Sequence, residues 1–361
     1  MSNIETNVDF NSIPLNDIKP YVEANAMLQL FNNQKGLVSP KLFIQGKPGI
    51  GKSDIIRDFC KEHGFGLVVK YMSNMLYEMM TGLPIADTLK VGTEAQWSKP
   101  NLFSFTNFAY LPSEESFDKD KTPIVLLIDD VHLCDKNIQK FLFQLLTYRS
   151  INDYTLPNNV ILILAGNRII DKAGAHPIPA PICNRLIFMD VTCSADDWIQ
   201  NFALHYGVRD DIITFVKHYG QDVLSGEPIE SAPWPSPRSW TFLSDQLTMF
   251  EKIRNRSLNV EELKTMCNGL IGCNVSNTFI AYCKLFSKWN YDELIKWKIE
   301  DVYKYFDQEI SSDGQENNPI VIYSIINSVT SYMIRVYKSN DHQMNDQVKK
   351  VVQFTYKVYT H

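Results

Sequence analysis

The chain has 361 residues, enough for about two domains, with a formal net charge of −6 and 45% apolar residues. These values exclude a miniprotein that needs disulfides to fold. The chain also lacks the overall basic charge that nonspecific nucleic-acid binding usually uses, although a single basic face remains compatible with this net charge. Seven cysteines occur, an odd number without any C-x-x-C spacing. They predict buried, reduced thiols rather than disulfides or a zinc site.

The first twenty residues are polar and acidic, and they lack the charged and then apolar pattern of a secretory signal. The longest apolar runs, residues 124–128 and 160–165, are far shorter than the roughly 20 residues of a membrane-spanning helix. We therefore expect no membrane contact and a cytoplasmic location. Frequent Asn, Lys, Ile and Tyr suggest an AT-rich genome, so we expect a bacterial protein or a viral protein in the host cytoplasm.

The first half of the chain alternates short apolar strands with segments of helical periodicity. Continuous apolar strands are typical of a parallel sheet covered by helices on both faces. The five predicted strands are residues 42–45, 67–71, 123–128, 160–165 and 185–191. From about Ser194 the strand pattern fades, and the predicted helices are residues 195–205, 210–219, 240–254, 260–270 and 274–289. We predict an α/β core in residues 1–194, a helical domain in 195–289 and a helical C-terminal extension in 290–361.

A phosphate-binding loop follows the first strand. Residues 46–53 read GKPGIGKS, which fits G-x-x-x-x-G-K-[ST] at every fixed position, and an amphipathic helix over residues 52–62 follows. Such a loop surrounds phosphates with backbone N–H groups, and a Cβ in place of the glycines would obstruct that approach. The alternative is a Gly-Pro turn before a helix. We expect contacts to ATP from Gly46, Pro48, Gly49, Ile50, Gly51, Lys52, Ser53 and Asp54, with Lys52 on the β- and γ-phosphates and Ser53 on Mg²⁺.

An acidic pair ends the third strand, where residues 127–130 read LIDD. A parallel sheet would place these carboxylates beside the phosphate loop, with Asp129 holding Mg²⁺ and Asp130 polarising the attacking water. Many ATPases have Glu at the second position, and Asp130 is one methylene shorter. Hydrolysis is therefore expected to be slow, and a nucleotide switch that rarely turns over is an alternative. A solvated Asp pair at the start of a loop is another.

Three further segments complete a family pattern. Residues 165–168 read AGNR, residues 179–186 read PAPICNRL, and residues 235–240 read PSPRSW. Together with the phosphate loop and the acidic pair, this order resembles the AAA+ ATPases, and most of all their MoxR-related branch. The resemblance covers about residues 42–250. It implies a P-loop AAA+ core with a five-stranded parallel sheet, followed by a helical lid.

The resemblance also implies roles for single residues. Asn167 matches sensor 1, which positions the lytic water, and Arg185 falls where the family has an arginine finger that reaches the neighbouring subunit's γ-phosphate. Arg168 is a weaker candidate for the same role. Arg238 matches sensor 2, on the lid side of the nucleotide. Read alone, these residues fit a turn-forming Asn-Arg pair, surface ion-pair partners and an exposed helix-terminal Arg.

Two segments match family insertions that face the central pore and engage the client. They are residues 76–100 and the hairpin 149–159. The hairpin carries Ile151, Tyr154 and Leu156, and Arg149 is its only basic residue, which favours a protein client over a nucleic-acid backbone. A plain surface hairpin is the alternative.

The resemblance implies a ring, a hexamer, with ATP between subunits. It also implies a chaperone-like function that remodels a protein client, with a von Willebrand factor A domain protein as partner. A nucleotide-gated assembly protein with marginal hydrolysis is a second hypothesis. A nucleic-acid motor or loader is a third, because residues 335–361 combine basic and aromatic side chains. The net charge disfavours a nucleic-acid client and leaves one open. His132 is expected to be a loop histidine rather than a metal ligand.

Overall fold

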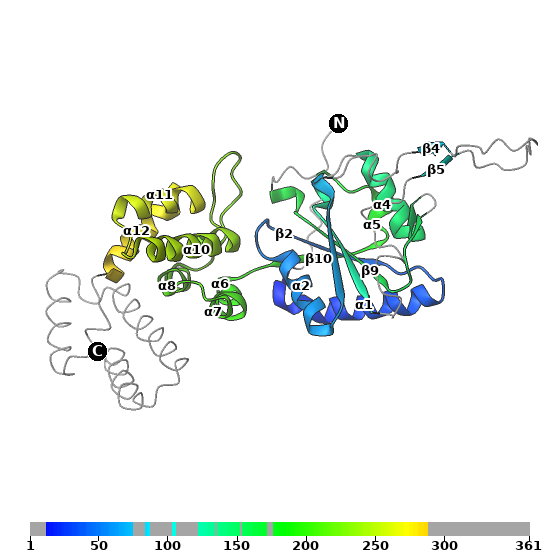
Figure 1. Cartoon of the computed structure of the whole chain (residues 1–361), viewed down its shortest axis with the longest axis horizontal. Coiled ribbons are helices and arrows are strands. Elements are labelled where there is room, and N and C mark those ends of the chain that lie inside the picture. Colours follow the sequence, from blue (N-terminus) through cyan, green and yellow to red (C-terminus); the bar gives the residue numbers. More distant parts are fainter. Residues whose placement is uncertain are drawn as a thin grey trace, which may run out of the picture. The chain divides into compact units, whose positions relative to one another are not determined.

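The computed structural model describes residues 12–74, 84–86, 103–105, 122–133, 136–151, 154–171 and 176–287. The chain divides into two compact units, Met1–Cys193 and Ser194–His361. The first contains a sheet and the second is helical where it is described (Figure 1). The predicted C-terminal extension, its basic stretch and most of the insertion at residues 76–100 lie outside the described residues. Within that insertion, β4 (Pro84–Ala86) pairs antiparallel with β5 (Phe103–Phe105), which lies just after the insertion in sequence.

The first unit has a parallel six-stranded sheet with the order β1-β10-β2-β9-β6-β3. Five of these strands are the predicted ones: β2 (Lys41–Gly46), β3 (Gly66–Tyr71), β6 (Ile124–Asp129), β9 (Val160–Gly166) and β10 (Leu186–Thr192). The sixth, β1 (Ile13–Pro14), pairs with Val191 and Thr192 at the end of β10. The predicted number of five was wrong because a two-residue strand is too short to show a periodic pattern. The predicted α/β class is confirmed.

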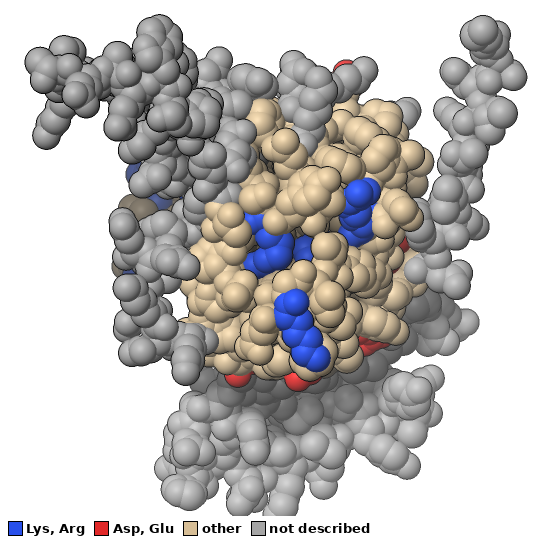
Figure 2. Space-filling model, turned by 90° about the vertical axis from the view of Figure 1, so that its right-hand side faces the viewer, with Lys and Arg blue, Asp and Glu red and all other residues tan. Residues whose placement is uncertain are grey.

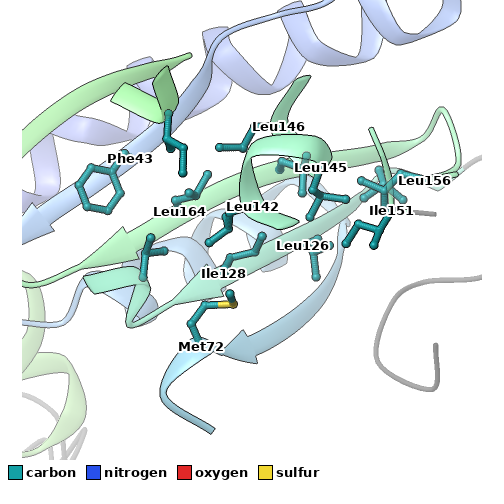
Figure 3. Packing of buried hydrophobic residues seen from close by; sticks show 14 of the residues in the cluster. Phe43, Met72, Leu126, Ile128, Leu142, Leu145, Leu146, Ile151, Leu156 and Leu164 are labelled. Carbon is teal, nitrogen blue, oxygen red and sulfur yellow. The ribbon is translucent and has the colours of Figure 1, made fainter. Parts of the chain in front are cut away.

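Helices cover both faces of the sheet, with α1 and α2 on one side and α4 and α5 on the other (Figure 1). α4 (Lys136–Tyr148) packs Leu142, Leu145 and Leu146 onto β6 and β9, at the spacing expected for one helix face. Figure 3 shows this cluster, in which Leu126 and Leu164 point from the strands toward α4. The opposite side chains of the same strands are also buried. Burial on both faces explains why these strands read as continuous apolar runs.

The predicted hairpin at residues 149–159 forms, as β7 (Ser150–Ile151) and β8 (Tyr154–Thr155). Its two aliphatic side chains, Ile151 and Leu156, are fully buried in the cluster under α4 (Figure 3). The guanidinium of Arg149 donates to the carbonyls of Pro157 and Val160, at 2.7 and 3.0 Å. The expectation that Ile151 and Leu156 contact a client was therefore wrong. They are apolar because they complete the core.

The helix that follows β1 buries a side that is largely polar. The buried residues of α1 (Lys19–Gln34) are Val22, Asn25, Ala26, Gln29 and Asn33. The Gln29 amide donates to the carbonyl of Leu162 at 2.8 Å and accepts from its N–H at 2.9 Å. The amides of Gln29 and Asn33 satisfy backbone groups of β9 ahead of the first residues that pair with β2, and the amide of Asn25 donates to the carbonyl of Pro40 at 3.1 Å. The outer side of α1 exposes four large apolar side chains, those of Tyr21, Met27, Leu28 and Phe31.

The second unit is a set of packed helices, as predicted. They are α6 (Ala195–Trp198), a π-helical turn (Ile199–Ala203), α7 (Leu204–Tyr206), α8 (Asp210–Tyr219), α9 (Gln221–Leu224), α10 (Pro237–Arg254), α11 (Val260–Ile271) and α12 (Cys273–Ser287). Aromatic rings form the core: Phe215 lies 5.5 Å from Trp240 and 5.0 Å from Phe279. The π-helical turn interrupts the single helix predicted over residues 195–205. Every helix in the described part of the chain is too short or too polar to span a lipid bilayer.

Candidate nucleotide-binding site

The segment predicted to bind phosphate links β2 to α2 (Lys52–His63). Gly49 and Gly51 have φ values of 79° and 101°, which lie in the left-handed region that favours glycine. At Gly46 a Cβ would lie 2.5 Å from the carbonyl oxygen of Val191. The loop therefore requires glycine at three positions, twice for its backbone and once for space. The N–H groups of the first turn of α2 have no carbonyl within the helix to bind, so they are available to an anion.

Lys52 brings the loop and the fourth predicted strand together. Its side chain is buried, and its ammonium donates to the carbonyls of Gly46 and Lys47, both at 2.9 Å, and to Oδ1 of Asn167 at 3.0 Å. Asn167 is 115 residues away in sequence. The two meet because β2 and β9 are neighbours in the sheet and both side chains follow the carboxyl end of their strand. The predicted lysine and the predicted sensor amide are thus in direct contact.

The acidic pair lies at the same end of the sheet. The hydroxyl of Ser53 donates to Oδ2 of Asp129, which is buried, and the N–H of Asp130 donates to Oδ1 of Asp129 at 2.8 Å. Asp130 has a φ of 56°, and its carboxylate accepts from the hydroxyl of Ser73 at 3.4 Å. A hydroxyl and a carboxylate are ligands that Mg²⁺ prefers, so Ser53 and Asp129 fit a magnesium ion held beside bound phosphates.

Asp54, which we also expected at the nucleotide, forms an exposed ion pair with Arg57 on the same helix. Its contact with a nucleotide stays a prediction.

A buried histidine packs against β2 and β9 close to these residues. His132 is buried, and its ring centroid lies 5.2 Å from that of Phe43. A Cβ on Gly166 would lie 2.4 Å from Nδ1 of the imidazole, so the ring occupies the space that this glycine leaves. Burial, and then the positive charge of Lys52, lower the pKa of His132 to about 4. The imidazole is neutral near pH 7. The expectation of a loop histidine missed this burial, and the glycine at a strand end was the signal that could have indicated it.

Arg168 is held within its own unit. It donates two hydrogen bonds to Asp171, both at 2.9 Å, and lies 3.5 Å from Asp190 on β10. Burial raises the pKa of Asp190, although the charge of Arg168 acts in the opposite direction. These pairs fix the turn that follows Asn167. Arg168 is therefore a structural partner of two carboxylates, which makes it a poor candidate for a finger that must reach another molecule.

Arg185 lies at the other end of the strands, directly before β10 begins. Its guanidinium stacks on the ring of Phe143, 4.3 Å from the centroid, and donates to the carbonyl of Pro181 at 2.6 Å. Leu186, the next residue, pairs with Lys41 at the start of β2, whereas the phosphate loop follows Gly46 at its end. About six residues of strand, roughly 20 Å, separate the two positions along the sheet. Arg185 is thus far from the phosphate loop of its own chain.

Arg238 belongs to the second unit and is exposed in the first turn of α10. Ser236 caps that helix by a reciprocal pair of hydrogen bonds with Ser239. The predicted contact between Arg238 and the nucleotide stays a prediction.

No family model and no curated protein sequence matches this chain. Similar solved structures include RuvB from Thermotoga maritima, described as a Holliday junction branch migration motor. That structure is 13% identical, covers 74% of each chain and has a TM-score of 0.35. A variant of the same RuvB is 14% identical over 84% of this chain and 86% of its own, with a TM-score of 0.39. NtrX from Brucella abortus is 11% identical over 95% of this chain and 69% of its own, with a TM-score of 0.39.

Proposed function

We propose that this chain is an AAA+ ATPase that binds ATP with Mg²⁺ and hydrolyses it. One observation carries the proposal. Contacts from Lys52 to Asn167 and from Ser53 to Asp129 join the carboxyl ends of β2, β6 and β9 around a loop whose backbone needs glycine. That is the arrangement in which a P-loop lysine, a magnesium site and a water-positioning amide act on one phosphate chain.

Each residue has a role that follows from its place. The ammonium of Lys52 would exchange its two loop carbonyls for phosphate oxygens, which offer a stronger, charge-assisted hydrogen bond. Ser53 and Asp129 would hold Mg²⁺, which neutralises charge on the phosphates when bound. Asp130 would accept a proton from the attacking water, and Asn167 would orient that water.

The wider role rests on the resemblance to the MoxR-related branch. We propose a ring, with six copies as in that family, in which Arg185 serves the nucleotide of the neighbouring copy and Arg238 couples the lid to nucleotide state. Such a ring would remodel a protein client in a chaperone-like way, together with a von Willebrand factor A domain protein. The separation of Arg185 from its own phosphate loop supports the part of this proposal that concerns a neighbour.

The test compares two lysines of one helix. Lys52→Ala should reduce ATP hydrolysis to background, whereas Lys61→Ala, at an exposed position of α2, should leave it within about twofold of wild type. Steady-state phosphate release and binding of a fluorescent ATP analogue are measured for both variants. A wild-type rate equal to that of Lys52→Ala, under conditions where the protein is assembled and client is present, would contradict the proposal.

A second candidate, a nucleotide-gated assembly protein with marginal hydrolysis, is favoured by Asp130. Its side chain is one methylene shorter than that of Glu, and its carboxylate accepts a hydrogen bond from the hydroxyl of Ser73 at 3.4 Å. If this function applies, ATP and a nonhydrolysable analogue should assemble the wild type equally well, and its turnover should match that of Asp130→Asn. Turnover at least tenfold above that of Asp130→Asn would instead favour the ATPase.

A further inference from the structure

A groove of about 580 Å³ lies within the second unit, between α10 and α11. Both helices bury residues on another face, so the groove is formed by their outer faces. Its wall on α10 includes Phe242, Asp245 and Gln246, and its wall on α11 includes Met266, Gly269 and Leu270.

The apolar part of the groove continues along α10. Phe242, Met249 and Ile253 are 52%, 52% and 73% exposed, and their spacing of seven and then four residues places them on one face of the helix. Single exposed apolar residues are ordinary, but contiguous groups mark sites of contact. From Phe242 to Ile253 this stripe is about 17 Å long, at 1.5 Å per residue, which is three turns of a helix. A bound helix of that length would cover the stripe, whereas a small molecule would cover only a part of it.

Gly269 leaves the α11 side of the groove open. It lies inside a helix, where glycine is less favourable than alanine, and a Cβ at this position would meet nothing within 4 Å. Packing among the described residues therefore does not require a glycine here. The missing side chain instead allows the backbone of a bound segment to approach α11 closely.

Asp245 supplies the charge of the groove. Its carboxylate accepts a hydrogen bond from the hydroxyl of Tyr206 at 3.0 Å. This hydrogen bond, and then the charge of Asp245, raise the pKa of Tyr206, so the phenol stays neutral and does not compensate the carboxylate. The ion pairs in the described part of the second unit are formed by other carboxylates, those of Asp196, Asp211, Glu251 and Glu262. An apolar groove with such a carboxylate is complementary to an apolar helix that carries a cation.

One end of the first unit has the opposite charge. Figure 2 faces the end at which α1 ends and β2 begins, and it shows Lys and Arg side chains among uncharged residues, with acidic ones only toward the rim. Exposed apolar residues occur there too: Phe31 is 56% exposed, and the ammonium of Lys35 lies 3.8 Å from its ring centroid. A helix with a cation would be repelled from that end, so charge directs it to the groove.

We propose that the groove binds an amphipathic helix of a partner protein. Its apolar side chains would pack on Phe242, Met249 and Ile253, and a Lys or Arg of the same helix would pair with Asp245. Both walls are preformed, because α10 and α11 each begin with a capping box. The inference goes beyond the proposed function and is independent of it, since the groove contains none of the residues assigned to the nucleotide.

The experiment uses two synthetic helical peptides as probes, with the full chain and without nucleotide. Both peptides have leucines at i, i+3, i+4 and i+7 in an alanine and glutamine background, and one residue beside the leucines is lysine in the first and glutamate in the second. Fluorescence anisotropy measures binding, and circular dichroism checks that each variant is folded. We expect the wild type to bind the lysine probe about fivefold more tightly than the glutamate probe, and Asp245→Lys to reverse that preference. Asp222→Lys, at an exposed position of α9 outside the groove, is the matched control and should keep the wild-type preference.

A third variant tests the shape of the groove. Gly269→Leu places a side chain in its open part and should weaken binding of both probes at least tenfold. Equal affinity of the wild type for the two probes would overturn the inference, as would undiminished binding in Gly269→Leu or the absence of binding to either probe. The mass of the protein is measured as well. If Asp245→Lys and Gly269→Leu prevent self-assembly that the wild type and Asp222→Lys show, a second copy occupies the groove and the inference is wrong.

Discussion

The parallel strands of the first unit begin at one end of the sheet, called here the amino edge, and finish at the other, called the carboxyl edge. The polar side chains at these two ends differ in the hydrogen-bond partners they have. At the carboxyl edge, Lys52 contacts Asn167, Ser53 contacts Asp129, and all of these partners belong to one chain. At the amino edge, the guanidinium of Arg185 meets an aromatic ring and a backbone carbonyl, without a carboxylate among its described contacts. Under the proposed function, the first edge holds the phosphates with residues of one chain, and the second leaves the cation of Arg185 for a neighbouring copy. The difference supports the proposal that a second copy completes the site.

Removal of the Arg185 guanidinium should have the largest effect on ATP turnover among the variants considered. In Arg185→Ala we expect steady-state turnover to fall about a thousandfold, since arginine fingers contribute on the order of 10³ to 10⁵ in rate. ATP binding should persist, because the phosphate loop is unchanged. Phosphate release and nucleotide binding are measured on the assembled protein. Arg185→Lys should recover little, because an ammonium lacks the planar fork of the guanidinium.

Mixing provides the control for that variant. We expect Lys52→Ala and Arg185→Ala each to be inactive alone, and their mixture to contain some sites in which Lys52 comes from one copy and Arg185 from the next. Recovery of turnover on mixing is expected. Normal hydrolysis by Arg185→Ala within an intact oligomer would show that the two edges do not cooperate.

The burial of His132 should make the free energy of unfolding depend on pH. The folded pKa of His132 is about 4 and its ordinary value is 6.5, so the unfolded chain binds more protons between these pH values. Stability should therefore be fully present above pH 6.5 and should fall as pH decreases toward 4, by up to roughly 3 kcal/mol at 1.36 kcal/mol per pKa unit. His132→Phe should lose less stability over this range. Urea unfolding at pH 7 and pH 4.5 compares the two, and equal losses would contradict the burial.

Substitution of Gly166, whose missing side chain leaves space for the His132 ring, should lower stability by a somewhat smaller amount. In Gly166→Ala the new methyl group would lie 2.4 Å from Nδ1 of His132 and 3.3 Å from the ring of Phe43. We expect a loss of about 1–3 kcal/mol in the free energy of unfolding, as for other overpacked cores. Gly269→Ala is the control, because its Cβ would meet nothing within 4 Å and alanine favours its helix. Equal stability of Gly166→Ala and wild type would show that the histidine can move aside.

Much of the carboxyl edge could be predicted from the sequence. Buried parallel strands are continuous apolar runs, and the residues that follow them converge at one edge whatever the details of packing. Asp129 was found on that basis, the glycine loop by its motif and Asn167 by the resemblance to the AAA+ ATPases, and the structure places all three together. The burial of His132 was missed, because the histidine itself carries no signal of it and the indication lay in Gly166, 34 residues further along the chain.

The amino edge was harder to predict. The buried side of α1 is largely polar, because the side-chain amides of Asn25, Gln29 and Asn33 bind backbone groups there beside Val22 and Ala26, so its pattern gave little sign of a buried helix. The opposite side of α1 exposes apolar residues such as Leu28 and Phe31, which composition alone would assign to a core. For Ile151 and Leu156 the error was the reverse: apolar residues of a hairpin were assigned to a client although they are buried. Residue type does not reveal which side of an element faces solvent.

The smallest effect concerns the ring beneath Arg185. A cation over an aromatic face contributes about 0.5–1 kcal/mol at a partly exposed site, so Phe143→Leu should lower turnover by roughly two- to fivefold. ATP binding and assembly should not change, because the stack orients the guanidinium without touching the phosphate loop. Phe143→Tyr retains the ring face and should keep wild-type turnover. If Phe143→Leu and Phe143→Tyr hydrolyse ATP equally fast in the assembled state, the stack contributes only to packing, and the neighbouring copy must itself orient Arg185.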